Sequence, residues 1–301
     1  MSTGPDAHGF LRNQRVVIFG AGYVGGAVAR ACLAAGARVD ALTRNPAKAA
    51  ALEEHGIHTV IGDMAERDWH EALRVGDYDC VLNCVSSGGG GLAGYQRSYY
   101  AGMESLRAWA GADGEARAHL IYTGSTSVYA AAAGERVGEQ SSLEEEAPLP
   151  RVLLATEQLV STWPAAWTVL RLAGIYGPGR HHLVSQMRET GEVAGRPEVR
   201  LNLVHRDDIV RAILATWGHA EAAAGRIFNV ADDGAAPKGE VVAWLAERLA
   251  LPTPAFTGLP AGGRRRNTPD RVIANDAFKA ATGWTPRYPT FREGYAAILG
   301  A

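Results

Sequence analysis

The chain has 301 residues, of which 47% are hydrophobic, and its 30 Lys and Arg nearly balance its 32 Asp and Glu. The resulting net charge of −2 gives no support for nucleic-acid binding, and the longest basic run is the three arginines at 264–266. No apolar run reaches the ~18 residues of a membrane-spanning helix, and the first residues lack the features of a secretory signal. We therefore expect a globular cytoplasmic protein that binds neither nucleic acid nor membrane.

Three cysteines, Cys32, Cys80 and Cys84, lie in apolar stretches, and no two of them form a CxxC pair. An odd number without such a pair argues against a disulfide framework and against a zinc site. We expect small core residues in a reducing compartment and no metal site.

Apolar runs and helical patterns alternate through the first half of the chain. Strands are predicted at 15–20, 37–43, 57–61, 79–85, 118–123 and 167–172, and helices at 23–35, 45–55, 68–74, 92–111 and 153–162. This order predicts an α/β fold, a Rossmann-type doubly wound parallel sheet with helices on both faces.

The pattern G-x-G-x-x-G at 20–25 follows the first predicted strand and opens the first predicted helix. In that context the first glycine permits a tight turn, the second lets backbone approach a pyrophosphate, and the third allows close helix–strand packing. The helix N-terminus favours the anion, whereas a tight turn without a ligand is the alternative. The predicted cofactor-binding residues of this turn are Gly20, Gly22, Tyr23, Val24 and Gly25.

The end of the second strand is expected to contact the adenosine ribose, and Thr43 and Arg44 lie there. An Asp or Glu at this place favours NAD, whereas an arginine can pair with the 2′-phosphate of NADP. Asp40 lies three residues earlier, too far back to compete, so NADP(H) is favoured over NAD(H). Asp63, after the third strand, can accept a hydrogen bond from the adenine; a turn or cap residue is the alternative.

After about residue 174 the pattern loosens, with more Pro and Gly, strands predicted at 201–204 and 226–230, and helices at 207–217 and 238–249. We expect residues 1–173 to form a dinucleotide-binding Rossmann domain. Residues 174–301 are expected to form mainly a smaller C-terminal substrate-binding cap, with some segments returning to the first domain.

Several longer blocks resemble the extended short-chain dehydrogenase/reductase superfamily, of the NAD-dependent epimerase/dehydratase type. Besides the glycine turn, they are TGSTSVY at 123–129, LRLAGIYGPGR at 170–180, NLVHRDD at 202–208, FNVAD at 228–232 and TGWTPRYP at 282–289. The resemblance covers about residues 15–299. The block VSSGGGG at 85–91 is more similar to atypical members of the superfamily, and it adds Val85 and Ser86 to the expected cofactor site.

The resemblance implies a nicotinamide facing a substrate alcohol or carbonyl, together with a Ser, a Tyr and a Lys four residues after that Tyr. Ser125 matches the serine, with a turn serine as the alternative. The Tyr and Lys fall on Leu149 and Leu153, and no lysine of the chain has a tyrosine four residues before it. The usual proton-transfer pair is therefore missing.

Tyr129 and Tyr176 are the alternatives for proton transfer, beside His181, His182 and the tyrosines at 95, 99 and 100. The alternative for each of these side chains is packing in the core or exposure to solvent. Arg180, His205 and Arg271 lie in segments that face substrate in the superfamily, and the two arginines can hold a diphosphate, unless they are ordinary surface residues.

These observations favour an NAD(P)-binding oxidoreductase or epimerase-like enzyme that acts on a polar small molecule, a nucleotide sugar being one candidate. Hydride transfer would then use a non-standard proton donor. The alternative is a catalytically inactive NADP(H)-binding regulator or sensor. The helix at 92–111, with Tyr100 or Trp109, is expected to contribute to a homodimer interface.

Overall fold

The structure, a computed structural model, describes residues 9–111, 116–130, 133–259 and 269–300. The arginine run at 264–266 and the first eight residues lie outside this range. None of the described helices has the length and apolar character needed to cross a membrane.

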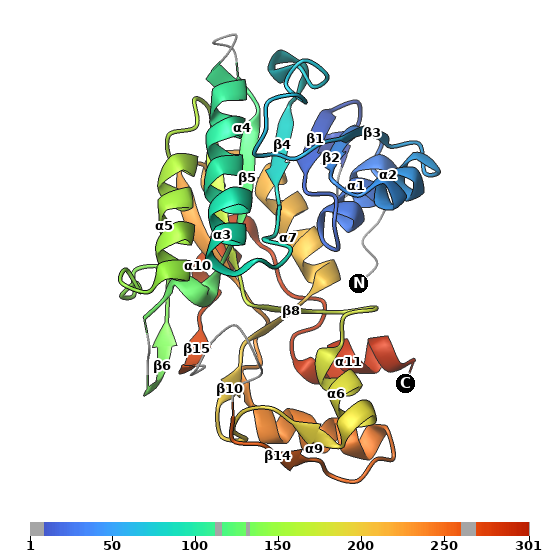
Figure 1. Ribbon diagram of the computed structural model, residues 1–301, viewed down its shortest axis with the longest axis vertical. Coiled ribbons are helices and arrows are strands. Elements are labelled where there is room, and N and C mark those ends of the chain that lie inside the picture. The colour runs from blue at the N-terminus through green and yellow to red at the C-terminus, as the bar shows by residue number, and fades with distance from the viewer. Residues whose placement is uncertain (1–8, 112–115, 131–132, 260–268, 301) are drawn as a thin grey trace.

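A parallel sheet of seven strands forms the centre of the described chain, in the order β12-β7-β5-β4-β1-β2-β3 (Figure 1). Its strands are β1 (Arg15–Phe19), β2 (Arg38–Thr43), β3 (His58–Ile61), β4 (Cys80–Asn83), β5 (His119–Ser125), β7 (Trp167–Leu172) and β12 (Arg226–Val230). The chain winds outward in one direction from β1 to β3 and then returns to β4 on the other side of β1. This reversal confirms the predicted Rossmann-type doubly wound fold.

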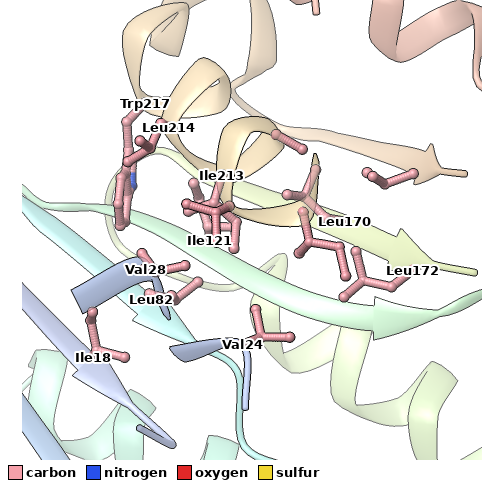
Figure 2. Close-up of a cluster of buried hydrophobic side chains, with 14 of the residues drawn as sticks. Ile18, Val24, Val28, Leu82, Ile121, Leu170, Leu172, Ile213, Leu214 and Trp217 are labelled. Atoms are coloured by element: carbon pink, nitrogen blue, oxygen red, sulfur yellow. The ribbon is translucent and has the colours of Figure 1, made fainter. Parts of the chain in front are cut away.

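Helices cover both faces of the sheet. On one face α1 (Gly25–Ala34) and α7 (Arg206–Gly218) pack against the strands, with Val28 and Ile213 among Ile18, Leu82 and Ile121 (Figure 2). On the other face lie α4 (Gly102–Gly111) and α5 (Pro148–Val160). The side chains of the central strands β1, β4 and β7 are mostly apolar and buried because both faces are covered, whereas the edge strand β3 has no buried residue.

The helix predicted at 68–74 is wrong, because this segment forms turns. Trp69 and Leu73 are both buried, and the Trp69 ring lies 4.8 Å from that of Phe19. A segment of seven residues has little helical stability of its own, so burial of its two large side chains decides its conformation.

Two further predictions need adjustment. The helix at 92–111 forms, but as α3 (Gly91–Tyr95), a π-helical turn (Gln96–Ala101) and α4. The strand at 201–204 is divided into β10 (Arg200–Leu201) and β11 (Leu203–His205). Asn202 separates them because its side-chain amide bonds the backbone of Arg271 and Ile273 instead of continuing one strand.

The later part of the chain forms a smaller lobe at the carboxyl ends of the strands, below the sheet in Figure 1. This lobe has its own apolar cluster, which includes Val193, Val241, Leu245 and Phe291. Its elements are β8 (Gly174–Tyr176), α6 (His182–Thr190), β9 (Glu192–Val193), β10, β11, β13 (Ala236–Pro237), α9 (Lys238–Arg248), β14 (Ala255–Phe256) and α11 (Phe291–Leu299).

Other late segments pack on the first half of the chain. Helices α7, α8 (Ala220–Ala223) and α10 (Asp276–Thr282) lie beside β12 at the sheet, and β15 (Asp270–Ile273) pairs in parallel with β6 (Ala133–Val137).

Asp232, just after β12, is a buried carboxyl at the junction of the sheet and the lobe. Its Oδ1 accepts the Gly234 amide at 3.2 Å, while its Oδ2 has no hydrogen-bond partner among the described residues. Burial raises the pKa of Asp232 to about 8. The folded protein therefore keeps a proton that the unfolded chain releases above pH ~4, where an ordinary Asp titrates.

We therefore predict that folding stability falls as the pH rises between about 4 and about 8, and that Asp232→Asn removes much of this fall. The measurement is urea denaturation of both proteins across this range. The unfolding free energy of the wild-type protein should fall most steeply between the two pKa values, whereas that of Asp232→Asn should change little over the same range. Parallel curves would contradict the assignment, and Asp77→Asn, at an exposed carboxyl, is the control.

Candidate dinucleotide and substrate cleft

A cleft of about 1110 Å³ lies where the carboxyl ends of β1, β2, β4 and β5 meet the smaller lobe. It therefore lies at the place where an α/β sheet of this order binds its ligand, beside the reversal between β1 and β4. Its lining comes from residues 20–24, 42–48, 62–64, 84–88, 123–125 and 172–175, with Tyr95, Tyr99, Leu153 and Arg180.

The three glycines of the turn have different surroundings, so each is needed for a different reason. Gly20 has φ +90°, and a Cβ there would lie 2.7 Å from the Val85 Cα. A Cβ at Gly25 would lie 2.6 Å from the Cys84 Sγ, so this glycine lets α1 pack against the end of β4. A Cβ at Gly22 would meet no atom closer than 3.9 Å, and Gly22 lines the cleft. The open position beside the start of α1 fits a dinucleotide pyrophosphate.

At the end of β2, Arg44 and Lys48 line the cleft, and Asn45 caps α2 (Pro46–Glu53) by accepting the Lys48 amide. Arg44 lies 3.5 Å from Asp63, whose carboxylate also receives Arg97 at 3.1 Å. Burial alone raises the pKa of Asp63, but the Ala65 amide and the two guanidiniums hold it below its ordinary value.

Asp40 is turned away from this site. Its carboxylate accepts the Tyr78 hydroxyl at 2.6 Å and contacts the His58 ring nitrogen at 3.1 Å, and Asp40 does not line the cleft. At the end of β2 the described residues therefore offer a guanidinium and an ammonium to a ligand, and the Asp63 carboxylate after β3 lies 3.5 Å from the guanidinium.

Ser125 lines the opposite end of the cleft. Its Oγ accepts the Ser127 amide at 3.1 Å, which leaves the hydroxyl proton for a substrate oxygen. The loop after it is held from behind by Arg271, whose guanidinium donates to the carbonyls of Thr126, Tyr129 and Ala130 at 2.9–3.1 Å.

Tyr129 and Tyr176, the two alternative proton donors, lie outside this lining. The Tyr129 hydroxyl donates to Asn229 at 2.7 Å, and that of Tyr176 donates to the Thr290 carbonyl at 3.5 Å. Both side chains are buried, and burial raises the pKa of each phenol. Instead, Tyr95 and Tyr99 line the cleft, with ring centroids 5.0 Å apart. Sequence reasoning named these two tyrosines without singling them out.

Leu153 is buried and lines the cleft on the side of Ser125, whereas Leu149 does not reach the lining. The three lysines of the chain are all accounted for elsewhere. Lys48 lies at the end of β2, Lys238 donates to the Ala194 carbonyl, and Lys279 pairs with Asp233 at 2.5 Å. No lysine therefore lies where it would act on a proton donor beside Ser125.

Of the three expected substrate residues, the structure brings only Arg180 to the cleft. His205 is 1% exposed, its Nδ1 accepts the Asp207 amide, and its ring lies 4.1 Å from that of Tyr288. Burial lowers the pKa of His205, which favours the neutral ring. Arg271 is also buried, and its bonds to the loop after Ser125 are inside the fold.

The sequence model of the NAD dependent epimerase/dehydratase family matches residues 16–231. A 3-diazoavenalumate denitrifying reductase of a Streptomyces species is 30% identical over 177 residues, which cover 52% of this chain and 57% of that protein. Protein YeeZ of Escherichia coli K12 is 29% identical over 171 residues, which cover 56% of this chain and 58% of YeeZ. The chain thus spans little more than half the length of these curated relatives.

Solved structures match over nearly their whole length. A functionally unknown conserved protein from Silicibacter pomeroyi has a TM-score of 0.77 at 25% identity, covering 96% of this chain and 99% of that chain. A UDP-glucuronic acid 4-epimerase from Bacillus cereus, solved with UDP-glucuronic acid and NAD, has a TM-score of 0.79 at 18% identity, covering 95% and 99%. The second likeness is one of fold.

The different surroundings of two glycines give a test of the pyrophosphate site. We predict that Gly22→Ala lowers dinucleotide affinity at least about tenfold without changing the melting temperature, because its methyl group would enter open space in the cleft. Gly25→Ala is the matched variant, and it should lower the melting temperature because its methyl group meets Cys84. Unchanged dinucleotide affinity in Gly22→Ala would contradict the placement.

Proposed function

Because the chain belongs to the NAD dependent epimerase/dehydratase family, we propose that it is an NADPH-dependent reductase of a polar small molecule. The observation that carries the proposal is the apolar Leu153 on the cleft wall, with every lysine of the chain placed elsewhere. The proton donor is then a group other than the tyrosine–lysine pair implied by the resemblance.

A nicotinamide dinucleotide is the cofactor that family membership supports, and when bound in reduced form it supplies hydride. Residues 20–25 would hold its pyrophosphate, and Asp63 its adenine. Val85 and Ser86 line the cleft between that turn and Ser125, where they would contact the middle of the cofactor. Preference for NADP(H) is supported by Arg44 and Lys48 at the end of β2, and by the engagement of Asp40 with Tyr78.

Because no lysine ammonium lies beside Ser125, one direction of the reaction is favoured over the other. Oxidising an alcohol begins with loss of its proton to a base, and a tyrosine serves as that base when a nearby ammonium lowers its pKa. Without one, a tyrosine stays protonated near neutral pH, since its ordinary pKa is about 10. Tyr95 and Ser125 line the cleft, and their hydroxyls can donate toward a substrate oxygen that gains charge. This asymmetry favours reduction over epimerisation or dehydration, which both begin with oxidation.

Among the relatives, the Streptomyces protein is named as a reductase, which supports the same direction. Ser125 would hold the substrate oxygen, because its hydroxyl proton is not used within the loop. The second candidate is an inactive NADP(H)-binding regulator or sensor, and the same leucine at 153 favours it. NADPH binding without turnover would distinguish this second candidate from the first.

For cofactor choice, we predict that the protein binds NADPH more tightly than NADH, and that Arg44→Ala weakens NADPH binding about tenfold or more while leaving NADH binding nearly unchanged. Fluorescence titration with NAD⁺, NADH, NADP⁺ and NADPH measures this, since the chain has seven tryptophans. Arg38→Ala, an exposed arginine at the opposite end of β2, is the control. Equal loss of both reduced forms in Arg44→Ala would assign Arg44 another role.

For turnover, we predict that Ser125→Ala lowers kcat for carbonyl reduction about 100- to 1000-fold while NADPH affinity stays the same. The assay follows NADPH oxidation with a panel of carbonyl compounds at pH 7. Ser161→Ala, at an exposed serine that bonds the Gln158 carbonyl, serves as the control. Full activity of Ser125→Ala would remove this hydroxyl from the reaction.

A further inference from the structure

Three cations line the described cleft, and they lie at two ends of it. Arg44 and Lys48 belong to the end of β2, where the proposed cofactor places its adenosine phosphate. Arg180 lies beside Tyr23 of the glycine turn, on the segment that leads into the smaller lobe. Among the described lining residues, Arg180 is thus the one cation that remains for a substrate.

Resting on the proposed reductase function, we infer that the substrate is a small carbonyl compound with one anionic group and an apolar body. Its anion binds Arg180, and its body packs on the wall formed by Leu153 and Tyr95. This class differs from nucleotide sugars, which carry a diphosphate and a polar sugar, and the test below compares the two.

The structure holds Arg180 in place before any ligand arrives. Gly177 and Arg180 exchange backbone hydrogen bonds at 2.9 and 3.1 Å, which close a tight turn. The Tyr23 hydroxyl donates to the Pro178 carbonyl of that turn at 2.9 Å, and the Arg180 guanidinium lies 5.6 Å from the Tyr23 ring centroid. An ordered guanidinium loses less freedom when it binds a carboxylate or phosphate.

Arg206 provides the contrast. Its guanidinium lies 5.2 Å from the same Tyr23 ring, but it is paired with Asp207 at 2.8 Å and does not line the cleft. Arg180 forms no ion pair with a carboxylate of the described residues. Of the two guanidiniums beside Tyr23, Arg180 is therefore the one placed to receive a ligand anion.

Among the described residues, this end of the cleft provides one cation, fewer than a diphosphate has negative charges. Arg271 and His205, the other expected substrate residues, are 5% and 1% exposed. Arg271 is committed to the carbonyls of Thr126, Tyr129 and Ala130, and the ring of His205 is enclosed by Tyr176 and Tyr288. A diphosphate at Arg180 would therefore meet a single guanidinium among the described residues, whereas a carboxylate would have its charge matched.

Part of the wall around the proposed hydride-transfer site is apolar. Leu153, Leu172, Ala173 and Ile175 line it, and the rings of Tyr95 and Tyr99 face the same space. Such an apolar part gains free energy from burying a ring or an aliphatic chain. In the reaction, the carbonyl carbon gains hydride and the C=O π bond breaks. The oxygen takes one proton from a cleft hydroxyl, which solvent replenishes, so NADPH and H⁺ are consumed and an alcohol and NADP⁺ are formed.

The test is calorimetric titration of the NADP⁺-saturated protein with 4-formylbenzoate, with its methyl ester and with UDP-glucuronate. We expect the acid to bind at least about tenfold tighter than the ester, and tighter than UDP-glucuronate. Arg180→Gln should abolish the preference for the acid, and Arg180→Lys should retain part of it. Arg206→Gln should retain all of it, and circular dichroism checks that each variant folds.

Equal binding of acid and ester, tighter binding of UDP-glucuronate, or an unaltered preference in Arg180→Gln would each overturn the inference. A loss of NADP⁺ affinity in Arg180→Gln would also overturn it, since Arg180 would then belong to the cofactor site. The proposed function is tested separately by NADPH binding and NADPH oxidation in the same preparation. Acid-selective binding without NADPH oxidation would refute the reductase but keep the anion site.

Discussion

The close packing of the glycine turn against the end of β4 is the constraint on which the cleft depends. A side chain at Gly20 would collide with Val85, and one at Gly25 would collide with Cys84. Only without those side chains can α1 begin at the point where β1 and β4 diverge. The positive end of the helix dipole then faces the cleft, and a ligand anion meets backbone instead of side chains.

The same turn also fixes the smaller lobe. Tyr23, within the turn, bonds the carbonyl of Pro178, and a Cβ at Gly177 would lie 2.7 Å from the Tyr23 hydroxyl oxygen. The backbone after β8 is therefore held against the glycine turn. A dinucleotide in the cleft would touch both parts of the chain, so its binding would stabilise the contact between them.

The sequence predicted most of the sheet, because an apolar run followed by a helical pattern is a local signal. The predictions that are wrong concern residues whose conformation depends on contacts with residues far away in the sequence. The turns at 68–74 follow from burial of Trp69 against Phe19, about 50 residues away in sequence. The sequence predicts a substrate contact for Arg271, but this residue bonds a loop about 145 positions earlier in the chain. An isolated arginine in a sequence does not reveal whether it faces solvent, ligand or backbone carbonyls.

A buried ion pair holds α5 in the orientation that places Leu153 on the cleft wall. Arg171 on β7 makes two bonds to Glu157 on α5, at 3.0 and 2.6 Å, with both side chains almost completely buried. Leu153 precedes Glu157 by one helical turn, so the two side chains lie on the same face of α5. Breaking such a pair is costly, and it therefore fixes which face of α5 meets the sheet and the cleft. The residue at 153 then sets the chemistry of that wall. An ammonium at 153 would place positive charge beside the reacting oxygen, whereas the leucine leaves an apolar surface that can bind a substrate body but cannot help to remove a proton.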